Sequence, residues 1–420
     1  MQVNVKAGLS FGAALKSILR CDPDIVMIGD PSINAFVAGG QVVYIHSGLL
    51  TVADNANQLQ AVIAHELGHV AGGHVIRMGE GVKAATGITI LSLVLGAAAI
   101  AAGAGEAGMG IIMAGQQAAQ GSFNSFTRAQ ESSADLAGAA YLSKAGYSGK
   151  GSLEFFKKLQ NQEYRLAVYA TNSYDRTHPL SSERIDALTQ IYHKDPAWNR
   201  PTDPAIELRF QRVKAKLTGY VNSRNAVTIY PESDQSIPAH YARAYAYHLG
   251  AYPEKALSEA DWLLAKMPDD PFFLELKGQI LLESGRPKDA IPVLRHSVKQ
   301  APDQPMISVM LGHALIATED DKNFAEAKQV LKTAINRDND NPFAWMQLGI
   351  VYDHEGDEPR AALATAERNN LEGEAKLALT SARVAMKGIP SGTPDFLRAQ
   401  DIAMVSEAEL KKNKKGHKDR

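Results

Sequence analysis

The pattern of hydrophobic and polar positions divides the chain into segments of different kinds. Three short runs near the N-terminus, 24–28, 35–38 and 41–45, are rich in β-branched and other apolar residues. Turn-forming residues, Asp30-Pro31-Ser32 and Gly39-Gly40, separate these runs. This pattern predicts a small β-sheet at the start of the chain.

A helix is predicted directly after these strands. Asn55 and Gln58 have the spacing of a capping box, and apolar residues then recur at helical spacing until Gly72-Gly73. Residues 128–200 carry further helical patterns. The first part of the chain therefore combines a few strands with several helices.

Small residues recur along the second half of the chain. They stand at Ala244, Gly278, Gly312 and Gly349, in steps of 34, 34 and 37 residues. A second row of alanines follows them, at Ala256, Ala290, Ala327 and Ala361. This period resembles that of tetratricopeptide repeats, in which paired helices stack into a solenoid. Such repeats have no chemistry of their own, so we expect this region to bind a protein partner.

One segment differs from the rest of the chain in charge. Residues 84–127 form a run of 44 residues in which Glu106 is the single charged residue. Residues 84–105 are long enough to cross a bilayer, but their many alanines and glycines favour insertion only weakly. We expect an apolar helical hairpin at about 84–127 that covers a neighbouring cleft, contacts a membrane peripherally or holds an unfolded client. A true transmembrane span over 84–105 is the alternative.

Composition excludes several classes of function. Lysine plus arginine number 44 and aspartate plus glutamate 46, a net charge of −2, so the chain lacks the basic excess of a nucleic-acid-binding protein. A single cysteine, Cys21, excludes an internal disulfide and a four-thiolate zinc site. Lys6, Lys16 and Arg20 interrupt the first residues, and no secretory signal is visible there. The basic run 411–418 predicts a solvated tail.

The predicted helix after Asn55 carries a motif with chemistry. His65-Glu66-Leu67-Gly68-His69 has the form H-E-x-x-H. On a helix, positions i and i+4 lie about 40° apart, so His65 and His69 can direct two imidazoles at one metal ion. Glu66 flanks the same face and can reach a water molecule at that metal. Twelve histidines in 420 residues make a chance match rare.

A catalytic zinc site needs a third protein ligand and an open position. The extended form H-E-x-x-H-x-x-G-x-x-H would place a histidine at position 75, where the chain has Val75. His74 lies about 180° from the ligand face by helical phase, which favours a structural role. Glu131 is the better candidate, because a carboxylate from a second helix would complete a two-histidine, one-glutamate site. Asp135, one turn later, can orient a ligand imidazole.

These residues resemble the gluzincin metallopeptidase family of the CAAX prenyl endopeptidases, HtpX and BepA. The resemblance rests on four elements that follow one another in the order typical of the family: Asn34–Gly40, His65–His69, Glu131–Asp135 and His178–Ile185. A peptidase domain followed by helical repeats is similar to the BepA-like periplasmic group. The resemblance covers about residues 34–185.

The resemblance implies one Zn²⁺ per chain, held by His65, His69 and Glu131, with Glu66 as general base. It also implies that Asn34, Ala35, Phe36 and Val37 belong to an edge strand on which a peptide substrate pairs. The oxyanion partner stays open among Tyr174, His178 and Arg184. His178 has a further alternative: as a fourth ligand it would hold the enzyme latent, or it is an ordinary histidine before a helix.

The expected fold is mainly α. An α+β zincin-type metallopeptidase domain covers 1–200, a helical connector and linker 201–235, an α-helical tetratricopeptide repeat solenoid 236–387, and a C-terminal helix with a basic tail 388–420.

The expected function is zinc-dependent cleavage of misfolded or unassembled polypeptides in the quality control of envelope or outer-membrane proteins. A protein partner binds through the repeats, and no nucleic acid binds. A chaperone or adaptor with a closed peptidase site is the alternative function. The resemblance favours a periplasmic or envelope location, with a cytoplasmic one as the alternative.

Overall fold

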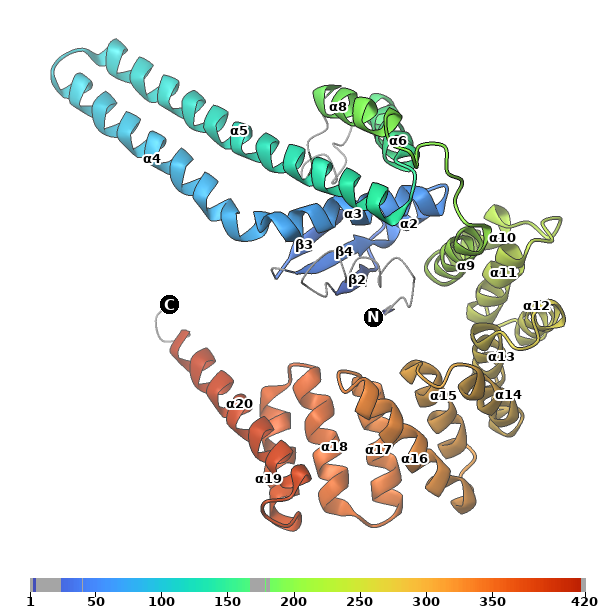
Figure 1. Ribbon diagram of the computed structural model, residues 1–420. Helices are drawn as coiled ribbons and strands as arrows, with labels where there is room; N and C mark the ends of the chain where they lie inside the picture. Colours follow the sequence, from blue (N-terminus) through green and yellow to red (C-terminus); the bar gives the residue numbers. More distant parts are fainter. Residues whose placement is uncertain (1–2, 5–23, 40, 167–177, 179–181, 417–420) are drawn as a thin grey trace. The chain divides into compact units, whose positions relative to one another are not determined.

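The computed structural model describes residues 3–4, 24–39, 41–166, 178 and 182–416 (Figure 1). The described chain is mostly α-helical, as the sequence predicts. It separates into two compact units, Met1–Val221 and Asn222–Arg420. The division between them lies inside the predicted connector 201–235, with a helix on each side of it.

The first unit contains a small sheet. Its strands are β1 (Val3–Asn4), β2 (Ile25–Ile28), β3 (Ala35–Ala38) and β4 (Val42–His46). The strand order is β1-β2-β4-β3, in which β2 and β4 are parallel and β3 and β4 antiparallel. The later three strands lie within one residue of the predicted runs. Among the strands that the structure describes, β3 forms one edge of the sheet.

Helices make up the rest of the first unit. They are α2 (Ser47–Val52), α3 (Ala56–Gly72), α4 (His74–Ala101), α5 (Gly105–Ala145), α6 (Lys150–Leu166), α8 (Ser182–His193) and α9 (Pro204–Val221). Leu49, Leu67, Phe155 and Leu159 are almost fully buried in a core that joins β4, α2, α3 and α6. This core fixes α3 against the sheet.

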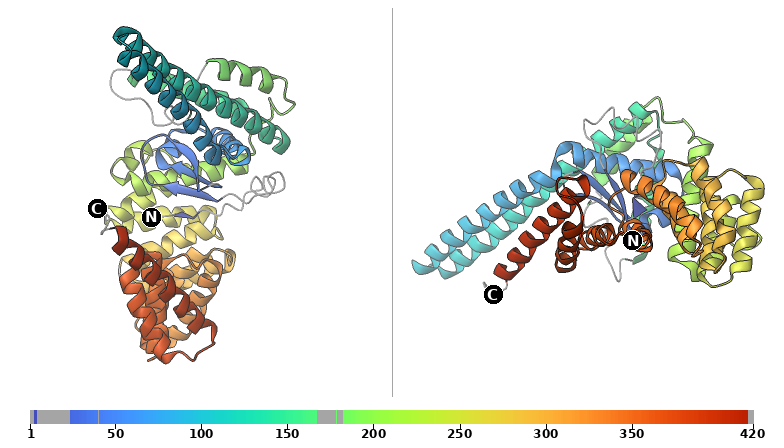
Figure 2. Two further views of the ribbon diagram at one scale, coloured as in Figure 1. Left: turned by 90° about the vertical axis from the view of Figure 1, so that its left-hand side faces the viewer. Right: turned by 90° about the horizontal axis from the view of Figure 1, so that it is seen from below.

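The apolar segment lies in two long helices, α4 and α5, which run side by side as an antiparallel pair in all three views (Figures 1 and 2). A short turn at 102–104 joins them, and Gly103 there has a φ of +88°. Both helices extend beyond the predicted boundaries 84 and 127. The apolar segment is thus the far part of a longer pair, and α5 continues unbroken from it to Glu131 because no proline or helix-ending turn intervenes.

The second unit is a series of helix pairs. Its helices are α10 (Ser223–Ile229), α11 (Ile237–Leu249), α12 (Pro253–Lys266), α13 (Pro271–Glu283), α14 (Pro287–Gln300), α15 (Pro305–Ile316), α16 (Asp321–Arg337), α17 (Pro342–His354), α18 (Glu358–Leu371), α19 (Ala375–Gly388) and α20 (Pro394–Gly416). Consecutive helices pack as α11–α12, α13–α14, α15–α16, α17–α18 and α19–α20. Helix pairing therefore continues beyond residue 387.

The small residues of the repeat pattern explain this pairing. A side chain at Gly278 would place its Cβ 2.4 Å from the Leu294 side chain, and one at Gly312 would lie 2.7 Å from Leu331. Ala244 is fully buried. A larger residue at any of these positions would push the two helices of a pair apart.

Candidate metal centre

Helix α3 carries the H-E-x-x-H motif, and its two ends are well defined. The Asn55 side chain caps the N-terminus by accepting a hydrogen bond from the Gln58 backbone N–H at 3.0 Å. At the other end Gly73 adopts the left-handed conformation, with a φ of +61°, and terminates the helix. His65, Glu66 and His69 are all buried along the helix between these caps.

Close packing of α3 on α5 brings Glu131 to the H-E-x-x-H motif. A Cβ at Gly68 would lie 2.5 Å from the backbone oxygen of Ala134, and a Cβ at Gly138 would lie 3.1 Å from the backbone of Ala64. Only small residues allow the two backbones to approach so closely. Glu131 is consequently delivered from α5 to the histidines of α3.

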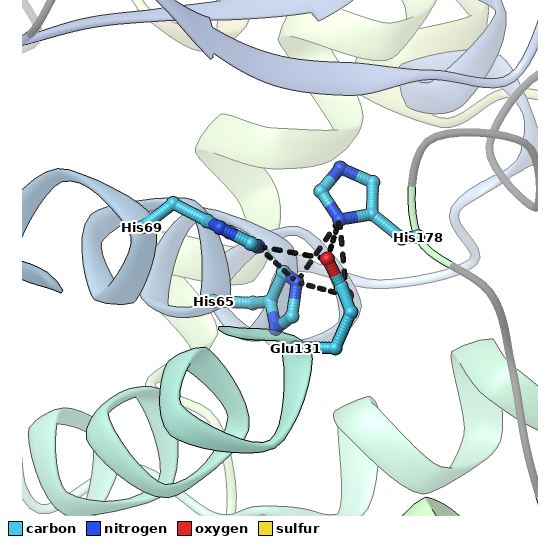
Figure 3. A group of neighbouring side chains, drawn as sticks. All are labelled: His65, His69, Glu131 and His178. Carbon is cyan, nitrogen blue, oxygen red and sulfur yellow. Dashed lines mark hydrogen bonds and ion pairs between the residues drawn. The ribbon is translucent and has the colours of Figure 1, made fainter. Parts of the chain in front are cut away.

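Four side chains converge at this crossing (Figure 3). His65 and His69 face one another with 3.1 Å between their Nε2 atoms. Glu131 lies 3.4 Å from each of these nitrogens through its two carboxylate oxygens. The His178 Nδ1 atom lies 3.3 Å from His65 Nε2 and 3.2 Å from Glu131 Oε2. All four residues are buried, and their ligand atoms lie within 4.8 Å of one another.

The spacing of these atoms fits a tetrahedral metal ion. Two ligands bound at about 2.0–2.1 Å in tetrahedral geometry are separated by about 3.3 Å, and the contacts given above span 3.1–3.4 Å. Imidazole nitrogen and carboxylate oxygen are also the donor types that zinc accepts. The four residues therefore form a group that can hold one metal ion.

Burial and neighbouring charges set the protonation of the cluster. Burial, with the nearby charge of His65 second, lowers the pKa of His69 to about 2, so its imidazole is neutral and keeps a lone pair for a metal. Burial opposes protonation of His65, but the hydrogen-bonding carboxylates of Asp135 and Glu131 outweigh it and raise its pKa to about 10, so a metal ion bound at Nε2 would have to displace that proton. Burial also raises the pKa of Glu131, but His178 and His65 more than offset this effect and hold that pKa far below its usual range.

Asp135 and Arg184 form a layer of contacts behind the cluster. Asp135 Oδ1 lies 2.9 Å from His65 Nδ1, the ring nitrogen that faces away from the other ligand atoms. Arg184 donates two hydrogen bonds to Asp135, at 2.7 and 2.9 Å, and its Nη1 lies 3.1 Å from Glu131 Oε2. One guanidinium thus links a carboxylate of the cluster to the carboxylate that orients His65.

His74 has a different environment from the one that helical phase predicts. Its Nδ1 lies 2.9 Å from the Nδ1 of His69, and its ring lies over Gly72, where a Cβ would be 2.2 Å from the His74 Nε2. The predicted phase extends through position 74, past the helix end expected at Gly72-Gly73, whereas the left-handed Gly73 ends α3 there and His74 begins α4. The Gly72-Gly73 pair was the signal in the sequence that this phase does not apply.

Glu66 is fully buried beside the cluster. Its Oε1 lies 3.4 Å from His178 Nε2, and neither carboxylate oxygen accepts a hydrogen bond from any residue that the structure describes. Burial raises the pKa of this carboxyl group, although the nearby charge of His178 partly offsets the effect. A carboxyl group with a raised pKa and free acceptor positions binds a proton more readily than an ordinary glutamate does, which suits it to proton exchange.

The edge strand β3 lies against the same cluster. The His46 backbone N–H donates to the Asn34 carbonyl at 2.9 Å, so Asn34 and His46 form a hydrogen-bonded pair. In an antiparallel ladder hydrogen-bonded and non-hydrogen-bonded pairs alternate, so Ala35 and Val37 belong to non-hydrogen-bonded pairs. Ala35 and Val37 therefore direct their backbone N–H and C=O groups to the outer edge. The Ala35 oxygen lies 3.1 Å from His178 Nε2. The Phe36 ring stacks on Tyr44, with 5.1 Å between the ring centroids.

The structure thus brings together most of the side chains that the sequence analysis names. His65, Glu66, His69, Glu131, Asp135, His178 and Arg184 lie in one buried network, and Ala35 borders it. Arg184 is fully engaged by the two carboxylates, whereas His178 faces the ligand atoms directly. Tyr174 and Gly40 lie outside the described residues.

Comparison with known proteins agrees with this geometry. Residues 12–192 match the model of peptidase family M48. The chain is 27% identical to the beta-barrel assembly-enhancing protease of Yersinia pestis over 386 residues, which cover 88% of this chain and 76% of the relative. It is 32% identical to the metalloprotease LoiP of Escherichia coli over 162 residues, 37% of this chain and 57% of LoiP.

Solved structures of repeat proteins also align with part of this chain. The tetratricopeptide repeat protein YrrB aligns with 42% of this chain and 92% of its own length, at 18% identity and a TM-score of 0.34. The family resemblance that the motifs indicated is confirmed by the match over 12–192. This chain carries a peptidase family M48 domain and is a metalloendopeptidase.

Proposed function

We propose that this protein is a zinc-dependent endopeptidase in which His65, His69 and Glu131 hold one zinc ion and Glu66 is the general base. The observation that carries the proposal is the tetrahedral spacing of the ligand atoms beside a buried carboxylate whose oxygens accept no hydrogen bond from the described residues. A zinc ion in this position would polarise a peptide carbonyl and lower the pKa of water at the open coordination position.

Glu66 would move the proton during hydrolysis. It takes a proton from the attacking water and delivers it to the amide nitrogen as the C–N bond of the peptide breaks. Its raised pKa supports this role, because the carboxylate is a stronger base than an ordinary glutamate and retains the proton until it is delivered. Asp135 and Arg184 would act as positioning residues, since Asp135 contacts His65 and Arg184 holds Asp135 and Glu131.

The substrate would bind as an extended polypeptide along β3. The outward N–H and C=O groups of Ala35 and Val37 offer the hydrogen bonds of an added strand. Recognition through the backbone depends little on sequence, so unfolded or unassembled proteins are suitable substrates. Such chains expose their backbone, whereas folded proteins do not.

His178 would close the site between turnovers as a fourth ligand. Its ring lies between the metal ligands and the edge strand, where a substrate carbonyl and backbone would have to enter. Opening would require this imidazole to move away. Arg184 is better suited to positioning than to stabilising an oxyanion, because each of its three side-chain nitrogens already contacts Asp135 or Glu131.

The cellular role we propose is quality control of outer-membrane proteins in the bacterial envelope. It is supported by the similarity to the beta-barrel assembly-enhancing protease of Yersinia pestis over most of both chains. The helix pairs of the second unit would bind the client or a protein partner. A periplasmic location follows from this role, and a cytoplasmic location is the alternative.

A second candidate function is that of a chaperone or adaptor whose peptidase site is normally closed. The position of His178 inside the cluster favours it, because a permanently closed site could not cut. Client binding through the repeats would then be the main activity.

Replacing Glu66 with Gln separates the two functions. The variant should keep one zinc ion per chain, measured by mass spectrometry of the purified protein, and lose cleavage of an unfolded protein substrate by roughly 10²–10⁴-fold. In cells that lack the wild-type protein, the endopeptidase proposal requires that the variant fail to restore quality control. Full restoration by Glu66→Gln would establish the adaptor instead.

A further inference from the structure

The far part of the α4–α5 pair, residues 84–127, is called the apolar hairpin below. Its large apolar side chains point outward. Ile90 is 57% exposed, and Leu91 and Val94 are each 60% exposed. Further exposed apolar residues of the hairpin are Leu93, Leu95, Ile100, Met109, Ile111 and Met113. A helix pair in water would bury such side chains between its helices.

Small residues bring the two helices close together, and only a few large side chains, such as Ile112 and Ile100, pack against them. The buried residues of α4 in this region are Ser92 and Gly96, and Gly108 is buried on α5. A Cβ at Gly96 would lie 2.4 Å from the Ile112 side chain and 2.7 Å from the Gly108 carbonyl oxygen, and a Cβ at Gly115 would lie 2.0 Å from the Ser92 Cβ. Close backbone approach through small residues, with large apolar residues outside, is the arrangement of helices packed in lipid.

Several polar groups of the hairpin form hydrogen bonds within their own helix. Ser92 donates to the Thr89 carbonyl at 2.8 Å, and Thr89 donates to the Ala85 carbonyl at 3.1 Å. Gln120 donates to the Asn124 side chain at 2.8 Å. Thr86, Thr89, Gln116 and Gln120 also line a shared groove of about 420 Å³ between the helices. Internal partners of this kind lower the cost of placing polar groups in hydrocarbon.

The length of the hairpin and the positions of its charged residues both match the thickness of a bilayer. The uncharged residues 84–101 of α4 rise by about 27 Å and residues 107–127 of α5 by about 32 Å, whereas the hydrocarbon core of a bilayer is about 30 Å thick. Lys83 and Arg128 flank the hairpin at its base, and Glu106 stands at its tip. Every charge would thus lie at a headgroup level, and none between. Among the described helices, α4 alone can cross a membrane by its own length and composition, so α5 would cross as its packed partner.

We propose that the apolar hairpin crosses a lipid bilayer as a helix pair and anchors the peptidase domain beside the membrane. The hydrocarbon chains of the lipid would cover its exposed apolar side chains. An unfolded client or a second copy of the chain would also cover apolar surface, but neither explains why glycines hold the helices together while the charges stand one bilayer thickness apart. The proposal does not depend on the peptidase chemistry.

Membrane extraction and cysteine labelling test this directly. In a Cys21→Ser background, one cysteine is placed at the tip by Ala102→Cys and another, in a separate protein, at the base by Gly79→Cys. The full chain is expressed, and sealed membrane vesicles are treated with a membrane-impermeant maleimide. We expect the protein to resist alkaline carbonate extraction and the two cysteines to react from opposite sides. Release by carbonate, or labelling of both from the same side, overturns the proposal.

A matched pair of variants separates lipid contact from a general loss of apolar surface. Leu91→Gln/Val94→Gln/Leu95→Gln changes the exposed face of the hairpin and should release folded protein into the soluble fraction. Leu377→Gln/Val384→Gln/Leu397→Gln changes equally exposed residues of α19 and α20 and should leave it in the membrane. Retention of the hairpin variant in the carbonate-resistant fraction overturns the proposal. The proposal is also overturned if the wild-type protein is found in the soluble fraction, with its apolar hairpin covered by a client or by a second copy of the chain.

Discussion

His178 Nε2 lies 3.1 Å from the backbone oxygen of Ala35, the outward-facing carbonyl of the edge strand β3. The opposite ring nitrogen of the same imidazole lies 3.2 Å from Glu131, within the group of metal-ligand atoms. One side chain therefore contacts both the strand on which a substrate would pair and the residues that would hold the metal. Any peptide that reached both would have to displace it.

Replacing His178 with Ala should raise peptidase activity. The change removes the ring that contacts both the ligand cluster and β3, but keeps His65, His69 and Glu131 in place. The initial rate of cleavage of an unfolded substrate at equal zinc content measures the effect. His193→Ala, a histidine on α8 that packs on Trp198, is the matched control and should change nothing. An unchanged or lower rate for His178→Ala would show that this residue does not close the site.

Replacing Asp135 with Asn should weaken metal binding. The carboxylate lies 2.9 Å from His65 Nδ1 and accepts two hydrogen bonds from Arg184, so its charge orients the imidazole and balances the guanidinium. Loss of such a supporting carboxylate lowers metal affinity by about 10–100-fold. Competition with a chelator of known zinc affinity measures this, with Arg128→Lys on the exposed part of α5 as control. Equal zinc affinity in the wild type and Asp135→Asn would show that Asp135 does not help to position the ligands.

Replacing Val37 with Pro should impair substrate binding without loosening the sheet. Proline removes an N–H that faces the outer edge of β3, a position at which an edge strand tolerates it. One lost hydrogen bond, worth about 0.5–1.5 kcal/mol, predicts a decrease in kcat/KM of roughly 2- to 12-fold at an unchanged Tm.

Ala38→Pro is the matched variant on the same strand. Ala38 and Val42 of β4 form a hydrogen-bonded pair, so the Ala38 N–H faces β4 and its loss in a proline variant should lower the Tm of the domain. If Val37→Pro leaves kcat/KM unchanged, the substrate does not pair with β3.

Replacing Gly68 with Ala should destabilise the first unit. The new Cβ would lie 2.5 Å from the Ala134 backbone oxygen, and a backbone atom cannot move aside without shifting α5. Overpacking of this kind costs about 1–3 kcal/mol in the free energy of unfolding, measured in urea. The shift would also move Glu131 away from His65 and lower zinc affinity.

Gly79→Ala on α4 provides the control for helix propensity. Nothing lies within 4 Å of the position its Cβ would take, so alanine should stabilise the helix by up to about 1 kcal/mol. If both glycine variants gained stability equally, the α3–α5 crossing would not depend on Gly68.

Local patterns in the sequence predicted much of the fold and the chemistry of the site. The three strands, the cap at Asn55 and the helix pairs depend on nearest-neighbour properties, namely turn residues, helical spacing and small residues at a fixed period. His65, Glu66 and His69 belong to the same class, because their geometry is that of one helix turn. Each of these features can be predicted without knowing which distant segment packs against it.

Other features depended on how distant segments meet. Helical phase placed His74 away from the ligands, and the left-handed Gly73 brought it within 2.9 Å of His69. The sequence leaves Tyr174, His178 and Arg184 as candidates for the oxyanion partner, and it does not predict how different the contacts of His178 and Arg184 are. Arg184 is held by Asp135 and Glu131, whereas His178 faces His65.

By itself, the sequence predicted which residues would carry the chemistry and where the main helices and strands lie. Only the tertiary structure decided that His178 lies between the ligand residues and β3, that Arg184 contacts both Asp135 and Glu131, and that most large residues of the hairpin face outward. The physical reason is that side-chain type and spacing act along one element. The meeting of two elements depends on packing at positions such as Gly68 and Gly138, and no local pattern identifies the partner of these positions.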